Sequence, residues 1–225
     1  MKPPYSLRDV RSLSTAGAKR YCDFLRSYLI RHVTENGGHL ASNLGIVEIS
    51  TALVRVMDLP RDKVIYDTGH QSYVHKILTG RGEAFPTLRK QNGISGFPRR
   101  EESEFDPFGT GHSGTGLSAA LGFAKAARLR GEDSFAVAVI GDGSFSGGMV
   151  FEALNNVSPR DRVIIILNDN GMSIGKSKGR LRANLNKLRT PGYYRFKAEF
   201  GEFLDSVPLV GDSLEYLAKG IKRVV

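Results

Sequence analysis

The stretch AVIGDGSFSGG, residues 138–148, ends a run of apolar residues on an acid between two glycines, Asp142 between Gly141 and Gly143. A carboxylate at this position serves no hydrophobic core. Glycine on either side lets the backbone turn sharply and lets a bulky group come close. Three interpretations are open at this point: a plain turn, a phosphate-binding nucleotide loop and a metal site.

Apolar strands and a helical segment alternate around this stretch. SFAVAVI (134–140) and RVIIILNDN (162–170) are continuous apolar runs of strand length, and the helix-like GGMVFEALNN (147–156) separates them. This alternation predicts an α/β fold with a parallel sheet covered by helices on both faces. Ligands of such sheets bind beyond the carboxyl ends of the strands, where Asp142 and Asn170 are placed.

Other elements follow from apolar spacing and from glycine breaks. Residues 81–108 are rich in glycine, proline and charge, and we expect a loop-dominated surface segment there. No linker divides the chain, so we expect a single domain over residues 1–225. The remaining expected elements are helices over residues 14–36 and 46–57, an alanine-rich helix that ends at Gly131, and a short buried strand at 63–69.

The composition is that of a soluble globular protein, with 40% hydrophobic and 24% charged residues in 225. No apolar run approaches the roughly 20 residues of a membrane span. The N-terminal sequence lacks the apolar region of a secretory signal, and the single cysteine, Cys22, suits a reducing compartment. We therefore expect a cytoplasmic enzyme without a membrane partner.

The net charge of +9 calls for a negatively charged partner. Eight basic residues and no acid lie between Asn170 and Ala198, concentrated in the segment 176–197. This basic segment is either a solvated loop or a collar that attracts phosphorylated small molecules. Nucleic acid is disfavoured as a partner because the basic residues are not interleaved with aromatic stacking positions.

Asp142 and Asn170 follow two strands that one helix connects. A right-handed crossover brings two such strand ends side by side. Carboxylate and amide oxygens suit Mg²⁺, which usually shares its ligand shell with water and phosphate. Gly143 and Ser144 add backbone N–H groups at the start of the next helix, which favours an anion beside the metal. The residues thus predict a metal-bridged diphosphate.

A Gly-Asp-Gly followed, one crossover later, by Asn-Asp-Asn is similar to the thiamine diphosphate signature of the transketolase superfamily. Longer motifs resemble the N-terminal region of the 1-deoxy-D-xylulose-5-phosphate synthase family. They run in family order from about residue 20 to about residue 176: GGHLASNLGIVEISTAL, YDTGHQSYVHKILTGR, GISGFPRREESEFDPFGTGHSGTGLSAALG, GDGSFSGGMVFEALNN and LNDNGMSIG. The resemblance implies a thiamine-diphosphate-binding fold.

The resemblance also implies roles for individual residues. His70 matches a cofactor-contacting histidine close to the reacting carbon, and His39 matches a histidine implicated in proton transfer and substrate contact. Imidazole suits both tasks because it changes charge near neutral pH. The implied Mg²⁺ ligands are Asp142, Asn170 and the main-chain oxygen of Met172, and the implied diphosphate contacts are Gly111, His112, Ser113, Gly143, Ser144 and Asn170.

The family's reaction is the decarboxylative condensation of pyruvate with glyceraldehyde 3-phosphate, which feeds isoprenoid, thiamine and pyridoxal synthesis. Full-length members are much longer and hold the pyrimidine of the cofactor, with an activating glutamate, in a later domain. We therefore expect a fold that is incomplete at its C-terminus and a chain that is inactive alone. It would need the missing pyrimidine-binding portion or a partner chain, and the complete enzyme would be a homodimer.

Two alternatives remain open. One is the N-terminal subunit of a split transketolase-type enzyme that uses another ketol donor. The other is a non-catalytic module that binds phosphate or nucleic acid, for which affinity would rise steeply as salt falls.

Overall fold

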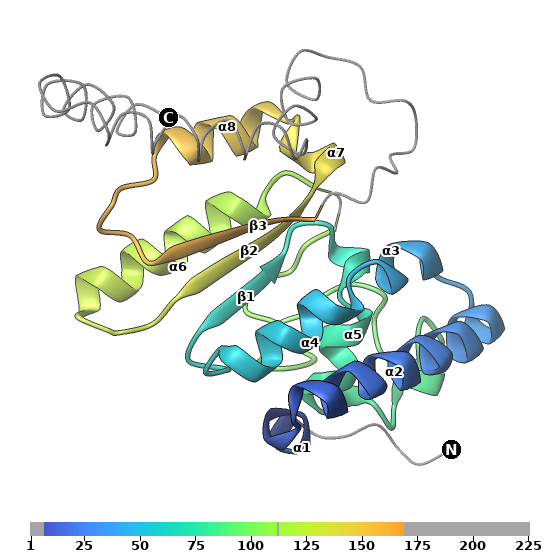
Figure 1. Cartoon of the computed structure of the whole chain (residues 1–225). Coiled ribbons are helices and arrows are strands. Elements are labelled where there is room, and N and C mark those ends of the chain that lie inside the picture. The colour runs from blue at the N-terminus through green and yellow to red at the C-terminus, as the bar shows by residue number, and fades with distance from the viewer. Residues whose placement is uncertain (1–6, 112, 169–225) are drawn as a thin grey trace, which may run out of the picture. The chain divides into compact units, whose positions relative to one another are not determined.

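Three parallel strands form one sheet in the computed structural model, which describes residues 7–111 and 113–168 (Figure 1). Their order in the sheet is β1 (Lys63–Tyr66), β2 (Ala136–Gly141) and β3 (Val163–Asn168). Lys63 lies opposite Ala136, which in turn lies opposite Val163. The carboxyl ends of the three strands therefore meet at one edge of the sheet, as the alternation of strands and helices predicts.

Helices connect and cover these strands. The three helices expected from the apolar spacing are present, and the last of them ends where Gly131 adopts a left-handed conformation, with φ 69°. The helices are α1 (Leu7–Ser12), α2 (Thr15–Asn36), α3 (Leu40–Leu44), α4 (Val47–Val56), η1 (Gly69–Gln71), α5 (Tyr73–Lys76), η2 (Ile77–Arg81), η3 (Phe85–Thr87), α6 (Gly116–Arg130), α7 (Asp142–Phe145) and α8 (Gly148–Asn155).

The sheet is buried on both faces because alternate side chains of β1 and β2 enter two separate hydrophobic clusters. Val64 and Tyr66 pack into a cluster with residues of α2, α4 and α5. Ile65, which lies between them in the sequence, packs with Ala138 and with residues of α6 and α8. Figure 1 shows these two groups of helices on opposite sides of the sheet. The predicted architecture is thus confirmed.

The segment 81–108 is loop-dominated, as expected, but the expectation that it lies on the surface is wrong for much of it. Phe85 and Leu88 are fully buried in the larger hydrophobic cluster, and Ile94 is nearly so. Asp106 is only 2% exposed. Buried polar partners, described below, make this burial of charge possible.

The chain divides into two compact units, Met1–Gly175 and Lys176–Val225. All described residues belong to the first unit. The expected single domain over 1–225 therefore extends past the described residues, and the basic segment 176–197 lies outside them. Within residues 7–111 and 113–168, no helix combines the length and apolar character needed to cross a membrane.

Candidate functional site at the carboxyl edge of the sheet

The predicted site residues that the structure describes gather around the carboxyl edge of the sheet. Asp142 follows β2 directly and begins α7. Gly141, the last residue of β2, lies opposite Asn168, the last residue of β3. The loops after β1 and β2 also meet, since the hydroxyls of Thr68 and Ser144 are 3.4 Å apart and hydrogen-bonded. The position of Asp142 just beyond a strand end is therefore as predicted.

The backbone after β2 differs in detail from the expectation. Gly143 and Ser144 lie in α7, a helix of only four residues, and the longer helix α8 begins separately at Gly148. Gly143 is exposed, whereas Ser144 is 6% exposed. A Cβ added to Gly143 meets no atom within 4 Å, so the space beside this backbone is open. The N–H groups of these residues thus belong to a short turn of helix, not to the start of α8.

The turn before α6 is anchored by Asp67, a residue that the sequence analysis missed. The buried carboxylate of Asp67 accepts the N–H of Gly114 at 2.9 Å and that of Gly116 at 2.6 Å. The N–H of Gly69 also donates to the carbonyl of Gly111 at 3.3 Å. These contacts fix the predicted turn, from which Gly111 and Ser113 are described, against the end of β1.

Asp67 changes the interpretation of that turn. The N–H groups of Gly114 and Gly116, at its helical end, bind a carboxylate of the protein itself, whereas the predicted diphosphate contacts are the residues before them, 111–113. Glycine is required at 116 because an added Cβ would lie 2.7 Å from the Cα of Asp67. The available signal was an acid placed directly after a buried strand, as at Asp142.

His39 and His70 are brought into direct contact. His39 precedes α3 and His70 lies in η1, yet their rings stack with centroids 4.0 Å apart and an angle of 22° between planes. His39 is exposed at the surface, but partial desolvation of its ring and, to a smaller extent, the positive charge of Arg89 lower the pKa of His39 below its ordinary value. The uncharged imidazole of His39 is therefore favoured at neutral pH, the form that can accept a proton.

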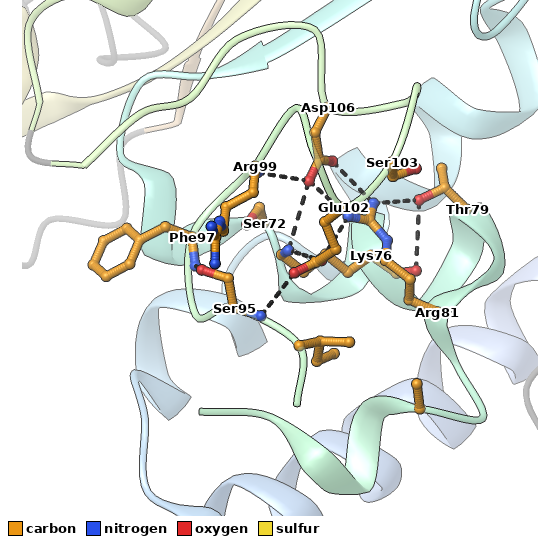
Figure 2. A network of polar contacts seen from close by, with 12 residues as sticks. Ser72, Lys76, Thr79, Arg81, Ser95, Phe97, Arg99, Glu102, Ser103 and Asp106 are labelled. Carbon is orange, nitrogen blue, oxygen red and sulfur yellow. Dashed lines mark hydrogen bonds and ion pairs between the residues drawn. The ribbon is translucent and has the colours of Figure 1, made fainter. Parts of the chain in front are cut away.

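A buried network of charged side chains holds the segment that leads to the turn at Gly111 (Figure 2). Arg81 donates to both carboxylate oxygens of Asp106, at 2.6 and 2.9 Å, and to Glu102 at 3.0 Å. Lys76, which is fully buried, also donates to Glu102. Two bases thus face two acids, and each charge in this group has an opposite partner.

The two acids also bind the backbone of their own segment. Glu102 accepts the N–H of Ser95 at 2.8 Å, and Asp106 accepts that of Arg99 at 3.0 Å (Figure 2). Burial raises the pKa of Asp106, but the hydrogen bond and charge of Arg81 outweigh burial and lower it overall. The carboxylates therefore stay ionised and hold the loop to α5 and η2.

His75 lies beside this network, and its burial should make the stability of the chain depend on pH. Burial lowers the pKa of His75 to about 4, although the nearby Asp106 raises it. In the unfolded chain His75 binds a proton near pH 6.5, whereas in the native chain it stays neutral down to about pH 4. As the pH is lowered from 6.5 to about 4, we therefore expect the free energy of unfolding to fall by about 1.4 kcal/mol per pH unit.

Urea unfolding at pH 7.0, 6.0 and 5.0 measures this dependence. His75→Gln removes the titrating group, so its free energy of unfolding should change less between pH 7 and 5. His39→Gln, which replaces a partly solvated histidine, serves as the control. Its free energy of unfolding should keep most of the pH dependence of the unmodified chain. An identical pH dependence in the His75→Gln variant and in the unmodified chain would contradict the assignment.

The structure describes only some of the predicted metal and diphosphate ligands. Of Asp142, Asn170 and Met172, only Asp142 lies among the described residues, and His112 of the predicted diphosphate set also lies outside them. Across residues 7–111 and 113–168, no group of three or more His, Cys, Asp or Glu could hold a metal ion by itself. Within these residues Asp142 therefore belongs to no such group.

The arrangement of the strands defines the class of fold. A transketolase from Leishmania mexicana superposes with a TM-score of 0.62 over 80% of this chain and 30% of that chain, at 21% sequence identity. At this identity the likeness concerns the fold alone. The described part of the chain thus has a transketolase-like fold.

Sequence comparison is more specific. The profile of the 1-deoxy-D-xylulose-5-phosphate synthase family matches residues 4–225. The 1-deoxy-D-xylulose-5-phosphate synthases of Syntrophomonas wolfei and Clostridium kluyveri are both 51% identical, over 98% and 97% of this chain. The chain belongs to this family, as its motifs predict. It spans about a third of the length of these curated relatives, 35% and 36% respectively.

Proposed function

We propose that this chain provides the diphosphate- and Mg²⁺-binding part of a 1-deoxy-D-xylulose-5-phosphate synthase. The observation that carries the proposal is the convergence of His70, Asp142 and the turn at Gly111 at one edge of the sheet, in a chain 51% identical to such an enzyme. The reaction is the thiamine-diphosphate-dependent decarboxylative condensation of pyruvate with glyceraldehyde 3-phosphate. Its product feeds isoprenoid, thiamine and pyridoxal synthesis.

The described residues fit such a cofactor. A Cβ added to Gly111 or to Gly143 meets no atom within 4 Å, so a bulky anion has room to approach both backbones. Asp142 contributes an oxygen ligand of the kind that Mg²⁺ prefers. We assign Mg²⁺ to Asp142, Asn170 and the main-chain oxygen of Met172, and the diphosphate to Gly111, His112, Ser113, Gly143, Ser144 and Asn170.

The two histidines have separate tasks in this proposal. When bound, thiamine diphosphate supplies the electron sink for the decarboxylation of pyruvate. His70 contacts the cofactor near the reacting carbon. His39, whose lowered pKa favours the neutral imidazole, accepts and returns a proton on the substrate. Their stacking keeps the proton-transfer group adjacent to the group that orients the cofactor.

The complete enzyme needs more than these residues. We propose that a pyrimidine-binding portion, on the same chain or on a partner chain, completes the site, and that the complete enzyme is a homodimer. The 225-residue chain alone is expected to release no 1-deoxyxylulose 5-phosphate.

A chimera tests the proposed reaction. In it, this chain replaces the matching part of the Syntrophomonas wolfei relative. With thiamine diphosphate and Mg²⁺, the chimera should form 1-deoxyxylulose 5-phosphate from pyruvate and glyceraldehyde 3-phosphate. His70→Ala should lower kcat by about 100-fold, since loss of orientation near the reacting atoms has effects of this size. Its thermal midpoint should change little.

His32→Ala is the matched control. His32 is 8% exposed and packs against Tyr28, with ring centroids 4.4 Å apart, in the hydrophobic cluster. This substitution should lower the thermal midpoint more than the turnover. A folded chimera that uses another ketol donor instead of pyruvate would favour the split transketolase-type alternative. A folded chimera with no turnover would contradict the proposal.

A further inference from the structure

Asn43 makes three hydrogen bonds that connect the segments of the two histidines. It lies in α3 and is fully buried. Its side-chain Nδ2 donates to the main-chain carbonyl of His39 and to that of His70, each at 2.7 Å. Its Oδ1 accepts the N–H of Tyr73 at 3.0 Å. One amide thus binds the loop before α3, η1 and the start of α5.

These partners fix the orientation of the amide. Two carbonyls require donors and one N–H requires an acceptor, so only one orientation of the Asn43 side chain satisfies all three. The bond to His39 lies within one helical turn and is the kind of local contact that an asparagine can make for structural reasons alone. The bond to His70 is different, because that residue is 27 positions away.

We propose that Asn43 is a positioning residue that fixes the stacked His39–His70 pair by binding the main-chain carbonyls of both histidines. The role rests on the function proposed above, because only there do the two rings act on one substrate. His39 is exposed at the surface and His70 only partly buried, so packing constrains neither ring strongly. Carbonyls held on a common amide fix the two backbone segments relative to each other, and this keeps the two rings within stacking distance.

The contact between the rings can be measured on the full chain without any cofactor. By NMR, the unmodified chain should show cross-relaxation between the imidazole protons of His39 and His70, because the ring centroids are 4.0 Å apart. Asn43→Ala removes all three hydrogen bonds and should abolish this signal. Asn43→Asp keeps an acceptor for the N–H of Tyr73, lacks the two donors, and should also abolish it.

Tyr28→Phe is the matched control. It removes one buried hydrogen bond to a main-chain carbonyl, that of Gly82 at 2.8 Å, and leaves the bonds of Asn43 to His39 and His70 in place. The signal between the imidazoles should persist in this variant even if its stability falls. If either Asn43 variant is folded and keeps the signal, the proposal is wrong.

A measurement on the unmodified chain covers the case in which neither Asn43 variant folds. Both Nδ2 protons of Asn43 are bound to carbonyls, so they should exchange with solvent far more slowly than those of the exposed Asn92. Equal exchange rates at the two asparagines would overturn the proposal.

Measurements on the chimera described above test the positioning role of Asn43 and the proposed function independently. There, Asn43→Asp should lower kcat by about 100-fold and leave the KM for pyruvate and the affinity for thiamine diphosphate within about threefold, the pattern of lost alignment. An active chimera whose kcat is unaffected by Asn43→Asp contradicts the positioning role alone. An inactive chimera together with a ring signal that depends on Asn43 contradicts the proposed function alone.

Discussion

Replacing Asp106 with alanine is expected to destabilise the chain by about 3 to 5 kcal/mol, a large share of the stability of a domain of this size. Asp106 is 2% exposed and accepts two hydrogen bonds from Arg81, which is itself buried. Its loss leaves the buried guanidinium short of a partner and also removes the acceptor for the N–H of Arg99. Urea unfolding of the full chain at pH 7 measures the effect.

The chain offers a matched control at an exposed ion pair. Glu101 lies 3.9 Å from Arg99, and both side chains are mostly exposed, at 78% and 61%. Glu101→Ala should change the free energy of unfolding by less than about 1 kcal/mol, as exposed ion pairs usually do. If Asp106→Ala lowers stability no more than Glu101→Ala does, the buried network is not what holds the segment 95–106 in place.

Replacing Asp142 with alanine is expected to abolish Mg²⁺-dependent binding of thiamine diphosphate in the chimera. Asp142 follows β2 at the carboxyl edge of the sheet and is the only proposed metal ligand with a carboxylate. Removing it should weaken cofactor binding at least about 100-fold. This is more than is usual for the loss of a residue that only hydrogen-bonds to a metal ligand. Calorimetric titration with and without Mg²⁺ measures the affinity.

The thermal midpoint and the same titration together distinguish a metal ligand from a structural residue. The thermal midpoint of Asp142→Ala should stay near that of the unmodified chimera, since Asp142 is half-buried at the end of a strand. Asp133→Ala, at an exposed acid that pairs with Arg162, should leave cofactor binding unchanged. Undiminished, Mg²⁺-dependent binding by Asp142→Ala would remove this residue from the proposed ligands.

The fold was predictable where local patterns decide the structure. The continuous apolar runs of β2 and β3 and the spacing of apolar residues in α2 follow from burial on one or two faces, which leaves a periodic signal in the sequence. The placement of Asp142 followed from the same patterns, because a strand end determines which residues come next to it. Family resemblance then supplied the proposed roles of residues that no periodicity reveals.

The contacts that organise the site were not predictable in this way. Glu102 and Asp106 resemble solvated charges in the sequence, and only the approach of Lys76 and Arg81 allows them to be buried. Asn43 binds a carbonyl 27 positions away. Such contacts depend on how distant segments meet, and no short stretch of sequence encodes them.

The pairing of β1 with β2 also has a consequence for how the protein is made. The two strands are direct neighbours, with Lys63 opposite Ala136, yet about 70 residues separate them. A ribosome adds roughly 5 to 20 residues per second, so β1 waits roughly 4 to 14 seconds for its partner to be synthesised. Throughout that interval the apolar residues of β1 lack the strand with which they pair in the folded sheet. We therefore expect the yield of folded protein to depend on translation speed and on access to chaperones over residues 67–141.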